Sequence, residues 1–136
     1  MSVTASDVAK LRSLTGAGMM DCKKALDEAE GDMEKAGEIL RKKGIIKAAK
    51  RTDKIAAEGT TQVKVSGDTA VVMELNSETD FVSGSPDFQN LASNFTDALL
   101  QNKPANLEQA MSAKVGAETA QEVLNNFTAK IGEKIS

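Results

Sequence analysis

Apolar residues in the first third of the chain recur at the spacing of short amphipathic helices. The stretch Thr4–Asp7 is typical of a capping box, and from there apolar positions recur every three or four residues until Gly16. A second such segment follows, and a third is capped by Asp32 and expected to end at Gly44. The residues expected to be buried are Val8, Leu11, Leu14, Cys22, Ala25, Leu26, Ala29, Met33, Ala36, Ile39 and Leu40. Residues 1–44 are therefore predicted to form a three-helix bundle.

Beyond Gly59 the spacing changes from that of helices to that of strands. The β-branched runs Thr60–Val65 and Thr69–Leu75 flank a Ser-Gly-Asp turn, which predicts an antiparallel hairpin. Residues 45–58, between the two patterns, mix Ala, Lys and Arg and form the predicted domain boundary. Two readings stay open for this linker: an extended segment, or a helical arm docked through Ile45, Ile46 and Ile55.

The remaining sequence adds helices to the hairpin. Ser85 and Pro86 suit the N-cap and first turn of a helix that Pro104 ends, and a short helical turn and a helix ending at Gly132 follow. The short turn is expected at Leu107–Met111. The expected apolar faces of the two longer helices consist of Phe88, Leu91, Ala92, Phe95, Ala98 and Leu99, and of Val123, Leu124, Phe127 and Ile131. The fold class of residues 59–136 is therefore α+β, with helices on a small antiparallel sheet.

This second unit is expected to be incomplete. A two-stranded hairpin is marginal alone, and the tail Glu133–Ser136 stops where another strand could begin. We therefore expect the chain to be truncated at a subdomain boundary, with an open sheet edge that could pair with a second copy.

Composition argues against an enzyme. The 136 residues contain no histidine, the commonest general base and metal ligand, and the single cysteine, Cys22, is expected to be a small core residue. The carboxylates of Glu74, Glu78 and Asp80 could hold a metal, but Glu74 lies in a predicted strand and nothing else points to catalysis. No metal and no cofactor are predicted.

Charge and hydropathy bear on location and partners. No stretch approaches the roughly 18 apolar residues that span a bilayer, and Met1–Lys10 lacks the features of a signal peptide, so we expect a cytoplasmic protein with no membrane contact. The net charge of −3 hides a basic cluster between residues 41 and 54. This cluster could be a solvated linker, contact an acidic protein surface or contact RNA phosphates. RNA is the weaker reading because no aromatic residues interleave with the basic ones, and DNA is not expected.

Two motifs stand out from these elements. In the first, Gly16–Gly18 presents consecutive methionines, Met19 and Met20, at a helix start; its spacing matches no nucleotide-binding loop. One methionine is expected in the core and the other at a partner surface. The second motif, Asn76–Val82, follows the second strand, and in isolation it is typical of a capped turn with Phe81 folded back into the core.

Together these motifs resemble the elongation factor Ts family. The resemblance rests on Leu11–Leu26, on the basic connector Lys47–Lys50 and on the Thr79–Val82 loop, and it extends over the whole chain. It implies a bundle similar to ubiquitin-associated domains followed by the first part of the family's core. It also implies a guanine-nucleotide exchange factor that binds elongation factor Tu and promotes GDP release by disturbing the site of magnesium and phosphate.

The resemblance assigns roles to individual residues. Asp80 and Phe81, within the motif Thr79, Asp80, Phe81 and Val82, are implied to act near the nucleotide, while Arg12, Met19 and Met20 are implied to grip a neighbouring helix of the GTPase. Full-length members continue into a second core subdomain, so weak or partial exchange activity is expected here. The alternatives are an RNA-binding or a ubiquitin-like-binding helical module without exchange activity.

Overall fold

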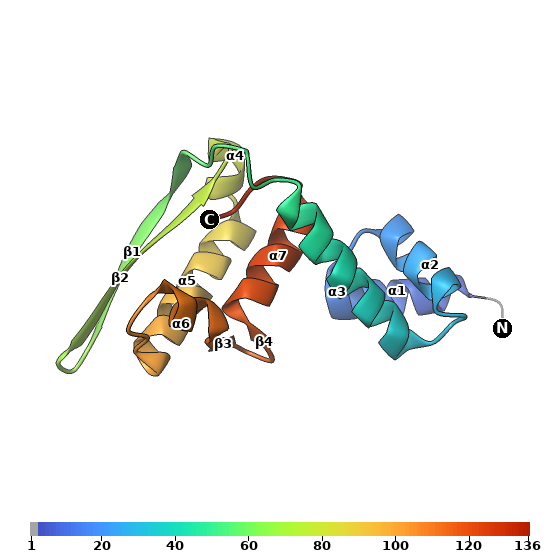
Figure 1. Cartoon of the computed structure of the whole chain (residues 1–136), viewed down its shortest axis with the longest axis horizontal. Coiled ribbons are helices and arrows are strands. Elements are labelled where there is room, and N and C mark those ends of the chain that lie inside the picture. The colour runs from blue at the N-terminus through green and yellow to red at the C-terminus, as the bar shows by residue number, and fades with distance from the viewer. Residues whose placement is uncertain (1–2) are drawn as a thin grey trace.

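A computed structural model describes residues 3–136; the first two residues of the predicted bundle lie outside this range. Its helices are α1 Ala5–Thr15, α2 Met19–Glu28, α3 Met33–Ala49, α4 Asp80–Ser83, α5 Pro86–Asn102, α6 Leu107–Ser112 and α7 Ala120–Ile131. Its strands are β1 Glu58–Ser66, β2 Thr69–Ser77, β3 Lys114–Val115 and β4 Glu118–Thr119. The hairpin β1–β2 lies at one end of the long axis and the α1–α2 pair at the other, with α5, α7 and α3 between them (Figure 1). The predicted α+β class is confirmed.

The first three helices enclose a small aliphatic core. Its fully buried members include Cys22, Ala25, Leu26 and Ala36, all with no exposed surface, and Leu11, which is 1% exposed. Local signals set the ends of α1: Thr4 and Asp7 form the predicted capping box, and Gly16 ends the helix at φ +67°, where a side chain would be strained. Leu14, expected in the buried stripe, is instead 69% exposed, so that prediction was wrong.

Helix α3 corrects the predicted helix end at Gly44, because the helix continues to Ala49. Gly44 is buried where α3 meets α7, and a methyl group there would come within 3.0 Å of Asn126 Oδ1. Glycine thus serves close helix packing at this position, which offsets its low helix propensity. The predicted division into units 1–44, 45–58 and 59–136 stays a prediction, with one continuous helix crossing its first boundary.

The first half of the linker is therefore a helical arm, but it does not dock through the predicted isoleucines. Ile45, Ile46 and Ile55 are 42%, 54% and 82% exposed. Instead, α3 and the turn after it pack through another face, where Arg41 contacts Glu122 of α7 at 3.1 Å and, beyond the helix, Arg51 bonds the carbonyl of Gly132. The basic residues and isoleucines of this segment do not indicate in the sequence which face of the helix packs. That depends on the position of α7.

The strands β1 and β2 form the predicted antiparallel hairpin. Ser66 pairs with Thr69 around the Gly67–Asp68 turn, and the register continues to Glu58 and Ser77, slightly beyond the predicted ends. Side chains alternate between the two faces: Met73 and Leu75 face the helices, while Val63 and Val72 are 64% and 72% exposed on the other face.

A second core lies between this sheet and the helices α5 and α7. It comprises Leu75, Phe88, Leu91, Ala92, Phe95, Ala120 and Ile135. Phe88 has no exposed surface, and its ring lies 6.4 Å from that of Phe127 at a tilt of 59°. The predicted cap Ser85 accepts a hydrogen bond from Phe88 N, and α7 ends at Gly132 as predicted.

The C-terminal tail takes part in this fold. Asn76 at the end of β2 exchanges two backbone hydrogen bonds with Ser136, of 2.7 and 3.0 Å, and Ile135 is only 4% exposed. The small β3–β4 hairpin was not predicted, because two-residue strands leave no periodic pattern. Self-association through the remaining open edge of β1–β2 stays a prediction.

Three helix-capping carboxylates make the stability of the fold depend on pH. The hydroxyl of Thr4 lowers the pKa of Asp7, the N–H of Lys35 lowers that of Asp32, and the N–H of Thr119 lowers that of Glu122. A carboxyl whose pKa is lower in the folded state stabilises the fold above its unfolded pKa, and this contribution is lost as pH falls through the folded value. We expect the thermal midpoint to begin to fall below about pH 4.5 and to keep falling below about pH 3.8, the ordinary values for Glu and Asp. Calorimetry across pH 6 to 3 checks this, and a variant with alanine at all three positions should show a shallower fall; identical slopes would contradict it.

Candidate functional site

The first candidate surface is the corner between α1 and α2. Arg12 lies exposed in the last turn of α1, and Met19 and Met20, in the first turn of α2, are 55% and 64% exposed. The expectation that one methionine is buried was wrong. Ala17 of the corner loop packs against the bundle core beside Cys22, so no methionine is needed there.

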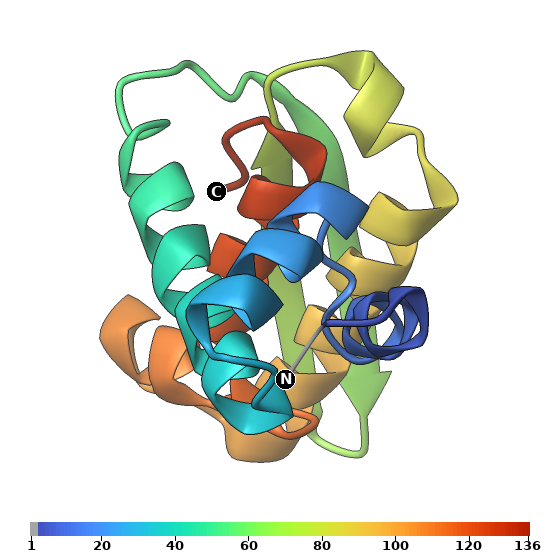
Figure 2. The same ribbon diagram turned by 90° about the vertical axis from the view of Figure 1, so that its right-hand side faces the viewer.

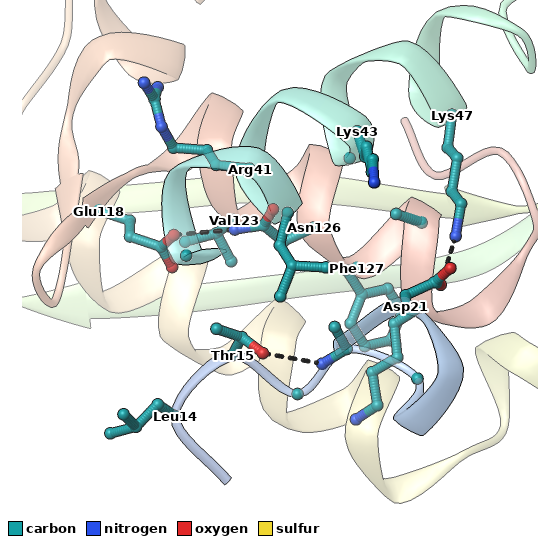
Figure 3. Close-up of a pocket in the computed structure, with 18 of the residues that line it drawn as sticks. Leu14, Thr15, Asp21, Arg41, Lys43, Lys47, Glu118, Val123, Asn126 and Phe127 are labelled. Atoms are coloured by element: carbon teal, nitrogen blue, oxygen red, sulfur yellow. Dashed lines mark hydrogen bonds and ion pairs between the residues drawn. The ribbon is translucent and has the colours of Figure 1, made fainter. Parts of the chain in front are cut away.

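A groove of about 550 Å³ runs beside this corner, between α1–α2, α3 and α7. Figure 3 shows Lys47 of α3 reaching Asp21 of α2, a pair separated by 2.7 Å, with Phe127 among the residues that line the groove. The exposed Leu14 lies at its edge. The groove lies between the bundle and the second unit. Most basic side chains of α3 form ion pairs with carboxylates of the same chain.

Four of the seven basic residues in the cluster between residues 41 and 54 pair with the chain's own carboxylates. Lys43 contacts Glu28 at 2.9 Å, and Arg51 lies 3.5 Å from Glu78. Together with the Arg41–Glu122 and Lys47–Asp21 pairs, this accounts for four of the cluster's basic residues. Such pairs reduce the positive potential that phosphate contacts require.

The second candidate surface is the segment after β2. Residues 80–83 form the single helical turn α4 rather than the predicted loop, with Thr79 as its N-cap residue. Phe81 is 89% exposed, so the reading in which it folds back into the core was wrong. Val82 is partly buried against the second core and Ser83 is 8% exposed, which anchors the turn so that Phe81 faces solvent.

The chemistry of this turn is that of a contact surface. Within residues 3–136 the Asp80 carboxylate has no hydrogen-bond or salt-bridge partner, and it stands in the first turn beside the exposed ring of Phe81. No group of three or more Cys, Asp or Glu in the described range is placed to hold a metal ion. Glu74 accepts from the Asn76 amide at 2.7 Å and Glu78 accepts from Lys134 N at 2.6 Å, so these two carboxylates have other partners.

The two candidate surfaces lie on different parts of the molecule. Figure 1 places α4 at the top, by the end of the sheet opposite the β1–β2 turn, and the α1–α2 corner on the other side of α3 and α7. Turned by 90°, the bundle lies in front of α7 while α4 stands away from it at the upper edge (Figure 2). Arg12, Met19 and Met20 therefore form one group, and Thr79, Asp80, Phe81 and Val82 form another.

Comparison with known families decides the relationship of the second unit. Residues 78–136 match the family model described as Elongation factor TS. Over these residues the chain is similar to elongation factor Ts proteins. The elongation factor Ts match begins one residue before Thr79 and includes α4, α5, α6 and α7, so the Asp80–Phe81 pair lies inside it and the α1–α2 corner lies outside it.

One residue that contacts the α4 turn was not indicated by the sequence. Glu133, in the tail after α7, accepts hydrogen bonds from both the backbone N and the hydroxyl of Thr79, at 3.0 and 2.7 Å. A glutamate in a short polar tail carries no local signal of such a contact, 54 residues away along the chain. None of the helices within the described residues combines the length and the apolar run that crossing a membrane requires.

Proposed function

We propose that this chain is a guanine-nucleotide exchange factor that binds elongation factor Tu and promotes release of GDP. The observation that carries the proposal is the exposure of Phe81, 89% of whose surface is open to solvent in an anchored helical turn beside Asp80. A large aromatic side chain held outward gains most when it enters a pocket of a partner. The family match over the same residues supports elongation factor Tu as that partner.

The proposed mechanism is linkage between two binding equilibria. A protein that binds the nucleotide-free GTPase more tightly than the GDP-bound form must weaken GDP binding by the same factor. Phe81 would occupy a pocket near the site of magnesium and phosphate, and Asp80 would accept hydrogen bonds that fix its direction. No covalent bond is made or broken, so the proposed role is that of a binding protein in cytoplasmic translation and not of an enzyme.

The two candidate surfaces would divide this work. The α1–α2 corner, with Arg12, Met19 and Met20, would dock on a helix of the GTPase, because flexible thioethers adapt to a partner surface. The α4 turn would act at the nucleotide. In this scheme residues 1–44 and 59–136 are the docking and acting units, and α3 holds them in one arrangement through its contacts with α7.

Neither alternative has an observation in its favour. An RNA-binding role would use the basic cluster between residues 41 and 54, in which four of the seven arginines and lysines are engaged by Asp21, Glu28, Glu78 and Glu122. A ubiquitin-like-binding role would use the bundle alone and would not explain the exposure of Phe81.

The direct test measures the release of fluorescent GDP from elongation factor Tu as the concentration of this chain is raised. The proposal requires acceleration that saturates with the chain. No acceleration when binding is saturated, measured separately by calorimetry, would overturn it, whereas tight binding to RNA with steep salt dependence would favour the first alternative.

The same titration tests the docking role of the corner. Changing Met19 and Met20 together to alanine should raise the half-saturating concentration about tenfold, the effect of losing 1–2 kcal/mol, and leave the maximal release rate unchanged. The control is the double change of Ile45 and Ile46 to alanine, which removes comparably exposed apolar side chains from α3. Equal effects of the two double variants would remove the corner from the interface.

A further inference from the structure

The turn that presents Phe81 is held by the end of the chain. Thr79 is the N-cap residue of α4, but its side chain does not cap the helix. Its hydroxyl and its backbone N instead both donate to Glu133, to Oε1 at 2.7 Å and to Oε2 at 3.0 Å. One carboxylate thus fixes both the backbone and the side chain of the residue at which the turn begins.

Further bonds continue this contact on either side. Asn76 and Ser136 exchange backbone hydrogen bonds, Lys134 N donates to Glu78 at 2.6 Å, and Ile135 is buried in the second core. These pairings run in opposite directions along residues 76–79 and 133–136, so the tail lies antiparallel to the segment that leads into α4. Figure 1 shows the C-terminus beside the C-terminal end of β2, below α4.

The turn after α3 joins the same contact. Arg51 lies 3.5 Å from Glu78 and donates to the carbonyl of Gly132, and Lys134 Nζ donates to the carbonyl of Thr52 at 2.8 Å. The tail is thus held on both sides, by the entry to α4 and by the turn after α3. Its glutamate is therefore presented to Thr79 from a supported position.

The turn α4 needs such support. Val82 and Ser83 pack its second half against the core, but it has four residues, too few for a helix to persist on its own, and the exposed Asp80 and Phe81 add no burial that would orient its first half. A loose turn would lose conformational entropy on binding, and it would leave the orientation of the Phe81 ring less well defined. We propose that Glu133 is a positioning residue for the Asp80–Phe81 pair, because its carboxylate fixes Thr79 and so sets the direction of α4. This inference rests on the proposed exchange function.

The first test uses the free chain and needs no GTPase. Amide hydrogen exchange followed by NMR should show Thr79, Ser83 and Gly84 exchanging about tenfold faster in Glu133→Ala, because a charged hydrogen-bond acceptor is lost. Amides in the middle of α5 should not change. Glu133→Gln should restore the slow rates, since its amide can accept from Thr79 N and donate to the hydroxyl. Unchanged exchange at these three amides in Glu133→Ala would overturn the proposal.

The second test measures GDP release from elongation factor Tu. Glu133→Ala should lower the maximal release rate about tenfold while the half-saturating concentration changes less than threefold, and Glu133→Gln should stay near the unsubstituted chain. Glu118→Ala is the matched control, because this glutamate also accepts a side-chain bond, from Asn126 at 2.8 Å, but lies away from Thr79. A loosened turn with an unchanged maximal rate would overturn the positioning role.

The reciprocal variant Thr79→Val keeps the shape of the side chain and removes the hydroxyl donor. If Glu133→Ala does not fold, as judged by circular dichroism, this variant should still lower the maximal rate; in a folded double variant the two effects should not add. Additive effects would contradict the direct Glu133–Thr79 link. Absence of GDP release with the unsubstituted chain would overturn the exchange function itself, whereas the hydrogen-exchange result decides separately whether Glu133 holds the turn.

Discussion

We expect Phe81→Ala to lower the maximal rate of GDP release from elongation factor Tu about 30-fold, which corresponds to the loss of about 2 kcal/mol from a hot-spot aromatic residue. The side chain is 89% exposed in the free chain, so under the proposed function its removal would take away only contacts made with the partner. The measurement is stopped-flow release of fluorescent GDP at saturating chain.

The control for this prediction is Leu107→Ala. Leu107 is 75% exposed at the start of α6, away from α4, and its truncation should leave the release rate unchanged (Figure 1). A release rate for Phe81→Ala equal to that of the control would show that the ring has no part in exchange. The free energy of unfolding of both variants should lie within about 0.5 kcal/mol of that of the unsubstituted chain, because exposed side chains contribute little to stability.

Phe88→Ala has the largest expected effect on stability. Phe88 has no exposed surface, and its ring packs against Phe127 in the core between the sheet and the helices α5 and α7. Truncating a buried phenylalanine costs about 3–5 kcal/mol through lost transfer energy and the cavity that remains. Small domains are stable by about 5–15 kcal/mol, so the second core would lose much of its margin.

Urea denaturation followed by circular dichroism measures this loss. Phe81→Ala is the matched control, because the same atoms are removed seven positions earlier from an exposed side chain. We expect the midpoint to fall strongly for Phe88→Ala and to stay nearly constant for Phe81→Ala. Equal midpoints would mean that the second core does not depend on the Phe88 ring.

Several elements of this fold follow from local chemistry and could be predicted. The capping box at Thr4, the cap at Ser85 and the turn at Gly67 each satisfy backbone groups through residues only a few positions apart. The apolar spacing of α5 likewise predicted the burial of Phe88 and Phe95, because a helical period places them on one face.

The candidate site was predictable only as a motif. The residues Thr79–Val82 stood out in the sequence, but the outward direction of Phe81 depends on Val82 and Ser83 packing against the core and on Glu133 bonding Thr79. The exposure of both Met19 and Met20 depends on Ala17 packing beside Cys22 in the bundle core.

The sequence by itself determined the caps at Thr4, Asp32 and Ser85, the hairpin and the apolar face of α5, since these depend on neighbours along the chain. Only the tertiary structure decided that α3 passes through Gly44, that Ile45 and Ile46 face solvent, and that the tail supports α4. Each of these depends on a contact between distant residues: Gly44 with Asn126, Arg51 with Gly132, and Thr79 with Glu133. Local propensity and periodicity carry no record of such partners, because the free energy that selects them arises only when the whole chain packs.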